Sequence, residues 1–187
     1  MSRLSPLDPP YDEDTQNAFD AIMPPGVPPL VLFRTLARFP RIYKKFRAGS
    51  LLDRGPLSLR LREITIDRTC ALNGCAYEWG VHVAFFAERA RLTPDEIAAL
   101  AGDGVCNSWS AAERTVIAAC DELHATARLS DATWRALAAA FDEAQIMEVI
   151  ALAGFYRTVS YFCNGLGLPP EPYGAPLRGA ASSRTSA

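Results

Sequence analysis

The sequence predicts an all-α protein, and three observations favour this fold class. Hydrophobic residues recur at helical spacing, as Val116, Cys120 and Leu123 do. A Ser or Thr followed three residues later by Glu, which is typical of a helix N-terminus, occurs at Thr93 and at Ser110. No long stretch alternates apolar and polar residues as a half-buried strand would.

Proline positions and capping residues define the helices one by one. Prolines cluster near the two ends of the chain, and only Pro94 falls between Ser58 and Gly165. Proline lacks an amide proton and fixes φ, so the clusters bound helices, whereas Pro94 follows Thr93 in a first turn, where proline is tolerated. Asn73-Gly74 predicts a break, and Gly165 and Gly167 predict a stop. We expect helices over 14–23, 29–49 with a break near Pro40, 59–72, 75–90, 94–101, 111 to about 123 after Ser110, 131 to about 141 after Ser130, and 143–163.

The length of the chain fits one domain. It has 187 residues, of which 49% are hydrophobic, and this is enough to build a packed core. We expect a single helical domain over 1–187, with its core at about 28–172. An arm over 1–13 precedes the core, and a small polar tail over 174–187 follows it.

Composition argues against several classes of partner. The net charge is −2, which gives no electrostatic basis for nucleic-acid binding. No uninterrupted apolar run approaches the roughly 18–20 residues of a membrane span, and the N-terminus lacks the apolar centre of a secretory signal. Five cysteines, an odd number, do not resemble a secreted disulfide scaffold and favour free thiols in the cytoplasm.

Apolar content also predicts self-association. A mean hydropathy of +0.02 is high for a soluble monomer. The helices over 59–90 carry more apolar surface than so small a bundle hides easily. We therefore expect a homo-oligomer that buries part of this surface together with the proline-rich segment 24–29. A small-molecule substrate is the other expected partner.

The segment that carries chemistry is 75–90, CAYEWGVHVAFFAERA. Up to Ala87 its only ionisable side chains besides Cys75 are Glu78 and His82, in an otherwise apolar helix that should be buried. Unpaired charges there cost several kcal/mol, and the i, i+4 spacing lets Glu78 and His82 contact each other. Cys75 lies on the same stripe at the helix start, where the helix dipole favours a thiolate. Glu63 can reach this cluster if the preceding helix packs antiparallel about Asn73-Gly74.

Other interpretations of these residues stay open. A Glu–His pair at this spacing is often only a structural ion pair. Cys, His and Glu are also zinc ligand types, but no paired Cys/His spacing supports a closed metal site, and we expect neither metal nor cofactor. The second histidine, His124, is interpreted as a partly exposed helix residue with Asp121 nearby.

These residues resemble a known family. Glu63, the segment Cys75-Ala-Tyr-Glu78-Trp-Gly-Val-His82 and the capping box that follows are similar to the carboxymuconolactone decarboxylase/alkylhydroperoxidase D family, in the branch with Tyr-Glu-Trp-x-x-His. The later features that fit this branch are Trp109, Glu113, Asp121-Glu-Leu, Tyr156 and Asn164-Gly. The resemblance implies an all-helical fold, a dimer, trimer or hexamer, and an active site on the motif helix.

One departure from the family pattern bears on the activity. In the peroxidase branch the motif is Cys-x-x-Cys-x-x-x-His with a glutamate twelve residues upstream, which matches Glu63, Cys75 and His82. Glu78 replaces the second cysteine, which attacks peroxide, and a carboxylate cannot form a sulfenic acid. The decarboxylase branch has Glu-x-x-x-His here, which matches Glu78 and His82.

The first functional hypothesis is acid–base chemistry, such as decarboxylation or proton transfer, on a small organic acid or lactone. His82 would donate or accept the proton, and Glu78 and Glu63 would set its tautomer and raise its pKa. The candidate cations for a substrate carboxylate are Arg62, Arg68 and Arg157.

Two alternatives accompany it. One is a thiol peroxidase that uses Cys75, with Cys70 as the candidate resolving thiol. The other is a catalytically inactive helical oligomer in which the Glu–His pair is structural.

Overall fold

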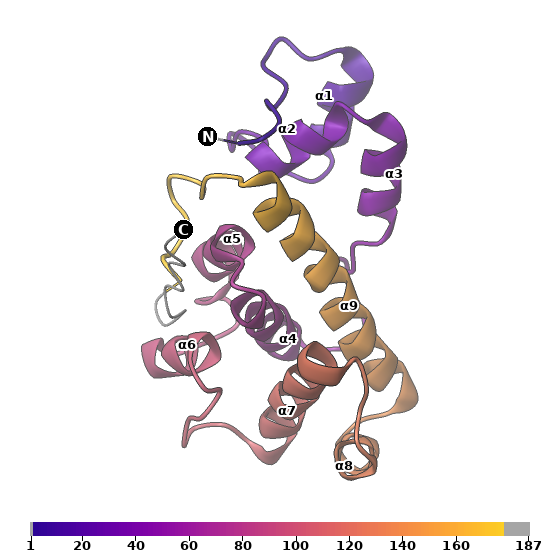
Figure 1. Cartoon of the computed structure of the whole chain (residues 1–187), viewed down its shortest axis with the longest axis vertical. Helices are drawn as coiled ribbons and strands as arrows, with labels where there is room; N and C mark the ends of the chain where they lie inside the picture. The colour runs from indigo at the N-terminus through magenta and orange to yellow at the C-terminus, as the bar shows by residue number, and fades with distance from the viewer. Residues whose placement is uncertain (1, 178–187) are drawn as a thin grey trace, which may run out of the picture.

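A computed structural model describes residues 2–177, and all regular secondary structure in this range is helical, which confirms the predicted fold class (Figure 1). The helices are α1 (Glu13–Asp20), α2 (Val31–Ala37), α3 (Pro40–Ala48), α4 (Leu59–Leu72), α5 (Ala76–Phe86), α6 (Pro94–Ala101), α7 (Ala111–Thr126), α8 (Asp131–Ala140) and α9 (Glu143–Leu166).

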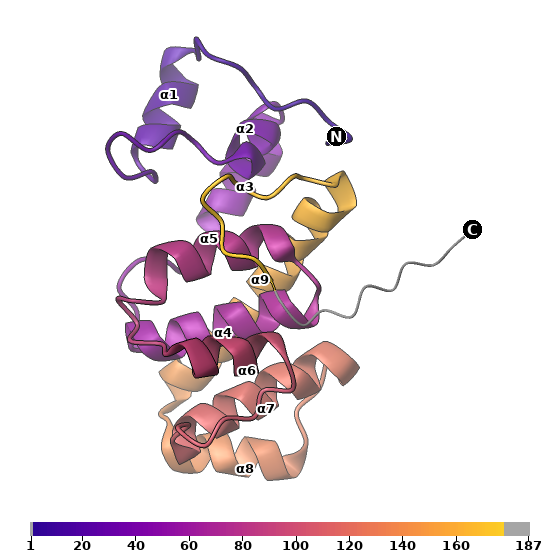
Figure 2. The same ribbon diagram turned by 90° about the vertical axis from the view of Figure 1, so that its left-hand side faces the viewer.

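Helix α4 is the centre of the packing. It contacts α5, α6, α7 and α9, while α8 packs on α7 and α9. Figures 1 and 2 show α1, α2 and α3 at one end of the molecule and α8 at the other, with α9 running along the body between them. Eight consecutive residues of α4, from Glu63 to Cys70, are buried, so polar side chains on this helix must find partners inside the fold.

Helix α9 has the length and composition of a membrane span, yet it is a core helix of this fold. It has 24 residues, and 44% of its most apolar 18-residue stretch is buried against the rest of the chain. Leu152 and Tyr156 are among its buried side chains. The packing of α9 on α4 and α5 therefore accounts for its apolar character.

The predicted breaks and caps are present. The segment 29–49 divides between Ala37 and Pro40, and Gly74 adopts φ +59°, which ends α4. Ser58, Thr93, Ser110 and Ser130 each accept a hydrogen bond from the amide three residues on. Local sequence chemistry thus sets the starts of four helices.

Three helix boundaries differ from prediction. The first helix spans Glu13–Asp20 rather than 14–23. Helix α5 ends at Phe86, not at 90, because the following residues turn and Arg91 adopts φ +55°. Helix α9 continues through Gly165 to Leu166 and ends at Gly167, which has φ +61°. Glycine at a helix interior weakens the helix but does not stop it.

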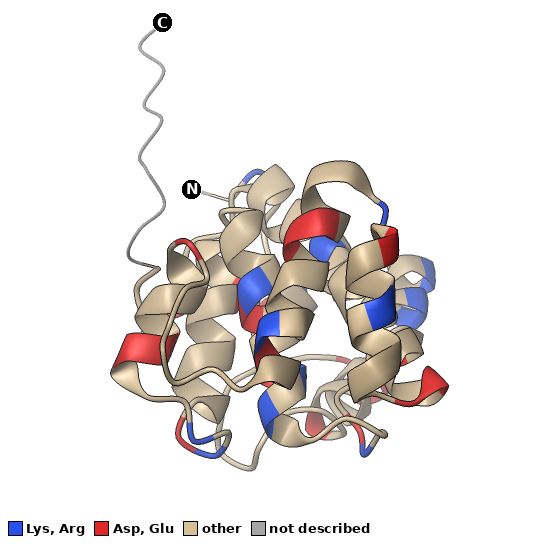
Figure 3. Cartoon of the chain, turned by 90° about the horizontal axis from the view of Figure 1, so that it is seen from below, with Lys and Arg blue, Asp and Glu red and all other residues tan. Residues whose placement is uncertain are grey.

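One arginine joins the starts of α6 and α7 to α4. The capping-box carboxylates of Glu96 and Glu113 both accept hydrogen bonds from the Arg60 guanidinium, which lies 5.5 Å from the Trp109 ring centroid. Burial raises the pKa of Glu96, but hydrogen bonds from Arg60, the Thr93 amide and Ser108 outweigh burial and lower the pKa to about 2. Charges of both signs are interspersed along the helices on the face shown in Figure 3.

The chain that follows α9 crosses the outside of α5. The Ala175 amide donates to the Gly80 carbonyl at 3.0 Å, and the rings of Tyr173 and Phe85 pack edge to face. Glu171 accepts hydrogen bonds from the Val31 amide and the Tyr77 hydroxyl. Residues 174–177 of the predicted tail are therefore packed against α5, and the rest of that tail, 178–187, lies outside the described residues.

This crossing predicts that Gly80→Ala destabilises the protein. A Cβ at position 80 would lie 2.9 Å from the Ala175 carbonyl oxygen, so the backbone of the crossing segment must move. Overpacking of this kind costs about 1–3 kcal/mol, measurable by urea denaturation. We also expect faster amide exchange over 171–177.

Gly154→Ala is the matched control, since it is a helical glycine whose added Cβ would meet no atom within 4 Å. It should leave stability unchanged or raise it by up to about 1 kcal/mol. Equal stability of Gly80→Ala and wild type would contradict the proposed crowding.

Candidate active site

Packing of α4 against α5 places His82 between two carboxylates. The His82 Nδ1 atom lies 2.7 Å from Glu63 Oε2, and its Nε2 atom lies 3.5 Å from Glu78 Oε1. The ring is 2% exposed and contacts Phe86 and Tyr156, at centroid distances of 5.3 and 5.0 Å. The predicted proximity of Glu63, Glu78 and His82 is confirmed.

The charge on this array follows from its contacts. Burial lowers the pKa of His82, but the hydrogen bonds and charges of Glu63 and Glu78 outweigh burial and raise the pKa to about 10. At neutral pH the ring is therefore an imidazolium, and both ring N–H groups point at carboxylates. Glu63 Oε1 accepts a further hydrogen bond from Arg62 Nε at 2.9 Å. The carboxylates of Glu63 and Glu78 thus offset the positive charges of His82 and Arg62 in the buried array.

A third carboxyl group, which sequence analysis missed, lies beside the array. Asp67 is one helical turn after Glu63, is 1% exposed, and its Oδ1 atom has no hydrogen-bond partner. Burial raises the pKa of Asp67 well above its ordinary value, and the His82 charge opposes this only in part. The i, i+4 spacing of Asp67 from Glu63 was the signal that could have revealed it.

Glu78 forms part of the wall of a wide cleft. The cleft has a volume of about 1090 Å³, and its walls come from α1, α3 and α9, with Glu78 contributed by α5. The second carboxylate oxygen of Glu78, Oε2, is buried and has no hydrogen-bond partner. Tyr156, which packs on the His82 ring, lines the same cleft.

The cleft lies on the Glu78 side of this array. Glu78 lines it, whereas His82, Glu63 and Cys75 are not among its lining residues.

The three candidate arginines do not line the cleft either. Each is engaged by another side chain: Glu63 binds Arg62, Asp121 binds Arg68, and the Tyr161 hydroxyl accepts a hydrogen bond from Arg157. Arg157 instead borders a separate cavity of about 200 Å³ together with His124, which is half-buried. The cations that line the large cleft are Lys44 and Arg47 on α3, which the sequence did not single out.

Cys75 occupies the N-cap position of α5, as the motif predicts. A hydrogen bond from the Cys163 thiol lowers its pKa; burial acts against this, and the Glu78 amide adds to the lowering. Cys70, the predicted resolving thiol, has its pKa raised well above the ordinary value by burial. All five cysteines are free thiols. Sequence analysis did not identify Cys163 as the neighbour of Cys75, since it lies far along the chain on α9.

Within residues 2–177, no group of three or more His, Cys, Asp and Glu side chains is arranged to hold a metal ion.

Comparison with a family model agrees with the motif. Residues 37–122 match the model of the Carboxymuconolactone decarboxylase family. This segment contains Glu63, Cys75, Glu78 and His82 and confirms the resemblance drawn from the motif. A search of curated proteins found no match.

Solved structures share the whole fold at low sequence identity. A peroxidase-related protein from Silicibacter sp. TM1040 is 18% identical with a TM-score of 0.79, covering 93% of this chain and 96% of that one. A peroxidase-related protein with an alkylhydroperoxidase AhpD core from Ralstonia eutropha JMP134 is 19% identical with a TM-score of 0.77, covering 90% and 93%. A cysteine-to-alanine variant of the debrominase Bmp8, in complex with 2,3,4-tribromopyrrole, is 14% identical with a TM-score of 0.72, covering 91% and 92%. At these identities the likeness establishes the fold.

The array predicts an unusually basic histidine. With only two histidines in the chain, NMR of the imidazole nitrogens should resolve both, and His82 should remain protonated up to a pKa of about 10. His124 is the internal control, because burial and the nearby Arg157 charge lower its pKa below 6.5. Two rings titrating together near pH 6.5 would contradict the array.

The raised pKa of His82 also predicts how stability depends on pH. A folded-state pKa above the unfolded value means that the stabilisation is complete below about pH 6.5 and is lost as the pH rises through about 10. The free energies of unfolding of wild type and His82→Gln, measured by denaturation, should therefore converge as the pH rises from about 6.5 through about 10.

Proposed function

We propose that the protein is an acid–base enzyme that acts on a small organic acid or lactone, with Glu78 as the group that exchanges a proton with the substrate. The observation that carries this proposal is the position of the Glu78 carboxylate. Glu78 lines the cleft, its Oε1 atom lies 3.5 Å from His82 Nε2, and its Oε2 atom is buried without a hydrogen-bond partner. A carboxylate placed in this way can move a proton between a buried reserve and a bound molecule.

The proton path runs from His82 to Glu78. In a decarboxylation, the bond between the substrate carbon and its carboxyl group breaks, carbon dioxide leaves, and the electron pair stays on the carbon. The His82 imidazolium passes its Nε2 proton to the Glu78 carboxylate, Glu78 delivers a proton to that carbon, and the neutral ring regains a proton from water. Glu63, 2.7 Å from Nδ1, keeps the ring oriented and stabilises its charge during the exchange.

The cleft is lined by four carboxylates, Asp12, Asp14, Asp53 and Glu78, and by two cations, and we place an anionic substrate with an unsaturated or apolar ring at the cations. Lys44 and Arg47 supply positive charge, and Phe33, Phe46 and Phe155 supply aromatic wall. A carboxylate at the cations would leave the ring against the aromatic side chains. This fits the carboxy-lactone in the name of the matching family.

Glu78→Gln is the first test of this function. The amide cannot carry the proton, so the rate of carboxymuconolactone decarboxylation, or of solvent-deuterium incorporation into related lactone acids, should fall at least about 100-fold. Asp53→Asn is the matched control, because Asp53 is an exposed carboxylate that lines the same cleft without contacting His82. A wild-type rate in Glu78→Gln, or no turnover of any lactone acid by wild type, would refute the proposal.

A second candidate function, thiol peroxidase activity at Cys75, is favoured by a separate observation. Cys75 caps α5 and has a lowered pKa, and peroxide reduction needs a thiolate. The peroxidase-related names of two structures with this fold are in keeping with that chemistry. The lack of a second cysteine in the motif means that a resolving thiol must come from elsewhere.

Peroxide consumption in the presence of a dithiol reductant separates the two candidates. If the second candidate is correct, Cys75→Ser abolishes consumption, whereas Cys120→Ser does not, since burial raises the pKa of the Cys120 thiol to about 12. Equal consumption by all three proteins would exclude Cys75 chemistry. If neither activity is detected, the result would fit the remaining alternative, a catalytically inactive helical oligomer in which the Glu–His pair is structural.

Self-association and a cytoplasmic location stay predictions. In the described residues, the large hydrophobic side chains that remain exposed lie outside 59–90, at positions such as Trp134, Met147 and Tyr161. Most apolar side chains of α4 and α5 are buried or half-buried within the chain itself.

A further inference from the structure

A cluster of sulfur and hydroxyl groups lies in the core beside the start of α5. It consists of Cys70 from α4, Cys75 at the N-cap of α5, and Ser160 and Cys163 from α9. All four residues are buried, with exposures of 0–1%. None of them lines the large cleft, so the cluster is distinct from the Glu78 surface.

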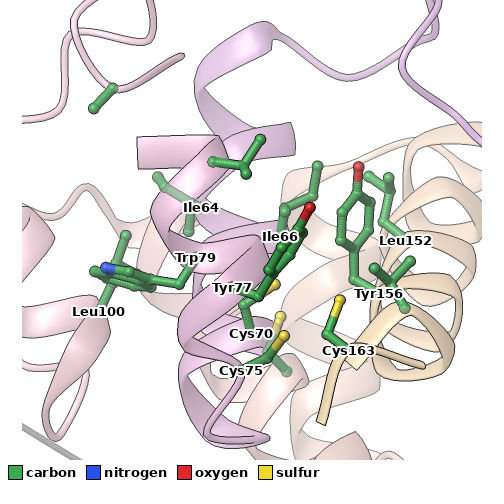
Figure 4. Packing of buried hydrophobic residues seen from close by; sticks show 14 of the residues in the cluster. Ile64, Ile66, Cys70, Cys75, Tyr77, Trp79, Leu100, Leu152, Tyr156 and Cys163 are labelled. Carbon is green, nitrogen blue, oxygen red and sulfur yellow. The ribbon is translucent and has the colours of Figure 1, made fainter. Parts of the chain in front are cut away.

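Within this cluster, Cys75 is paired with Cys163. The Cys163 thiol hydrogen-bonds to Cys75, and Ser160 also lies in hydrogen-bonding contact with Cys75. Figure 4 shows the two cysteines entering the same part of the core from α5 and α9, with Cys70 nearby on α4. Cys70 contacts Cys75 through the backbone, since its carbonyl accepts the Cys75 amide proton at 2.9 Å.

The two sulfur atoms differ in acidity in the way that thiol exchange requires. The Cys163 hydrogen bond lowers the pKa of Cys75, and the same hydrogen bond and burial raise the pKa of Cys163. Cys75 is therefore the more acidic of the two thiols. A thiolate is oxidised first, and a neighbouring thiol then condenses with the product.

We propose that Cys75 and Cys163 are a redox pair, in which a hydroperoxide oxidises Cys75 and Cys163 resolves it as a disulfide joining the start of α5 to α9. This inference rests on the second candidate function, thiol oxidation at Cys75, and does not depend on proton transfer by Glu78. It replaces Cys70, the resolving thiol expected from the sequence, with a residue outside the motif.

The two steps balance in atoms and electrons. The Cys75 thiolate attacks one peroxide oxygen; the sulfur–oxygen bond forms, the oxygen–oxygen bond breaks, and the alkoxide takes a proton to leave as an alcohol, or as water from hydrogen peroxide. Cys163 then attacks the Cys75 sulfenic sulfur; the sulfur–sulfur bond forms, and the hydroxyl leaves with the thiol proton as water. Two cysteine sulfurs are oxidised by two electrons in total, and one peroxide is reduced.

Geometry limits the second step. A disulfide requires the sulfurs to close to about 2.05 Å, so the pair must move from hydrogen-bonding contact into bonding distance. Both thiols are side chains on packed helices, and rotation of these side chains within the cluster is the movement that the step needs.

Peptide mapping of the full chain tests the pair directly. Wild-type protein is treated with hydrogen peroxide, free thiols are alkylated, and tryptic peptides are analysed by mass spectrometry without reduction. We expect one peptide pair that joins Cys75 to Cys163. Because this readout uses wild type, it does not depend on whether any variant folds.

Two variants sharpen the test. Cys163→Ser should stop at a Cys75 sulfenic acid, trapped by dimedone, while Cys70→Ser should still form the link to Cys163. Folding of both is checked by circular dichroism.

The outcomes separate this inference from the function on which it rests. A Cys70–Cys75 link, or a Cys75 sulfenic acid in wild type with no disulfide, would overturn the pair but leave thiol oxidation at Cys75 standing. Cys75 unmodified by excess peroxide would overturn both.

Discussion

The buried imidazolium of His82 constrains the centre of this fold. A charged ring that is 2% exposed is tolerated only when both of its N–H groups meet carboxylates, and these come from two different helices, Glu63 on α4 and Glu78 on α5. The register between α4 and α5 is therefore fixed by an electrostatic requirement as well as by apolar packing. Arg62 binds Glu63 and adds a second cation to the array, while burial raises the pKa of the neighbouring Asp67.

The start of α5 carries two side chains with different proposed chemistry, Cys75 and Glu78, within one turn. Glu78 lines the cleft, and Cys75 presents its sulfur to the core on the side of α9. These side chains lie in different environments, one lined by charges of both signs and aromatic rings and the other by thiols and a hydroxyl. Each proposed activity can therefore be removed by substitution without touching the residues of the other.

Sequence reasoning succeeded where local chemistry decides the structure. Caps such as Ser58 and Ser110 act within one turn, and the antiparallel packing about Asn73-Gly74 brings Glu63 to His82. It failed where distant segments meet: Cys163 reaches Cys75 only because α9 packs on α5, and the cleft cations come from α3, which no motif marks. Asp67 shows a middle case, since its spacing was visible but its burial was not considered.

The segment that crosses α5 joins main chain to main chain, through the Ala175 amide and the Gly80 carbonyl. Such a contact depends on the absence of a side chain at position 80 but hardly on which side chain stands at the crossing residue. We therefore expect natural sequence variation to be restricted at position 80 and freer in the crossing segment. The exposed neighbour, Pro176, is accordingly a site where a fluorescent reporter could be attached on the outer face of the motif helix while its inner face stays intact.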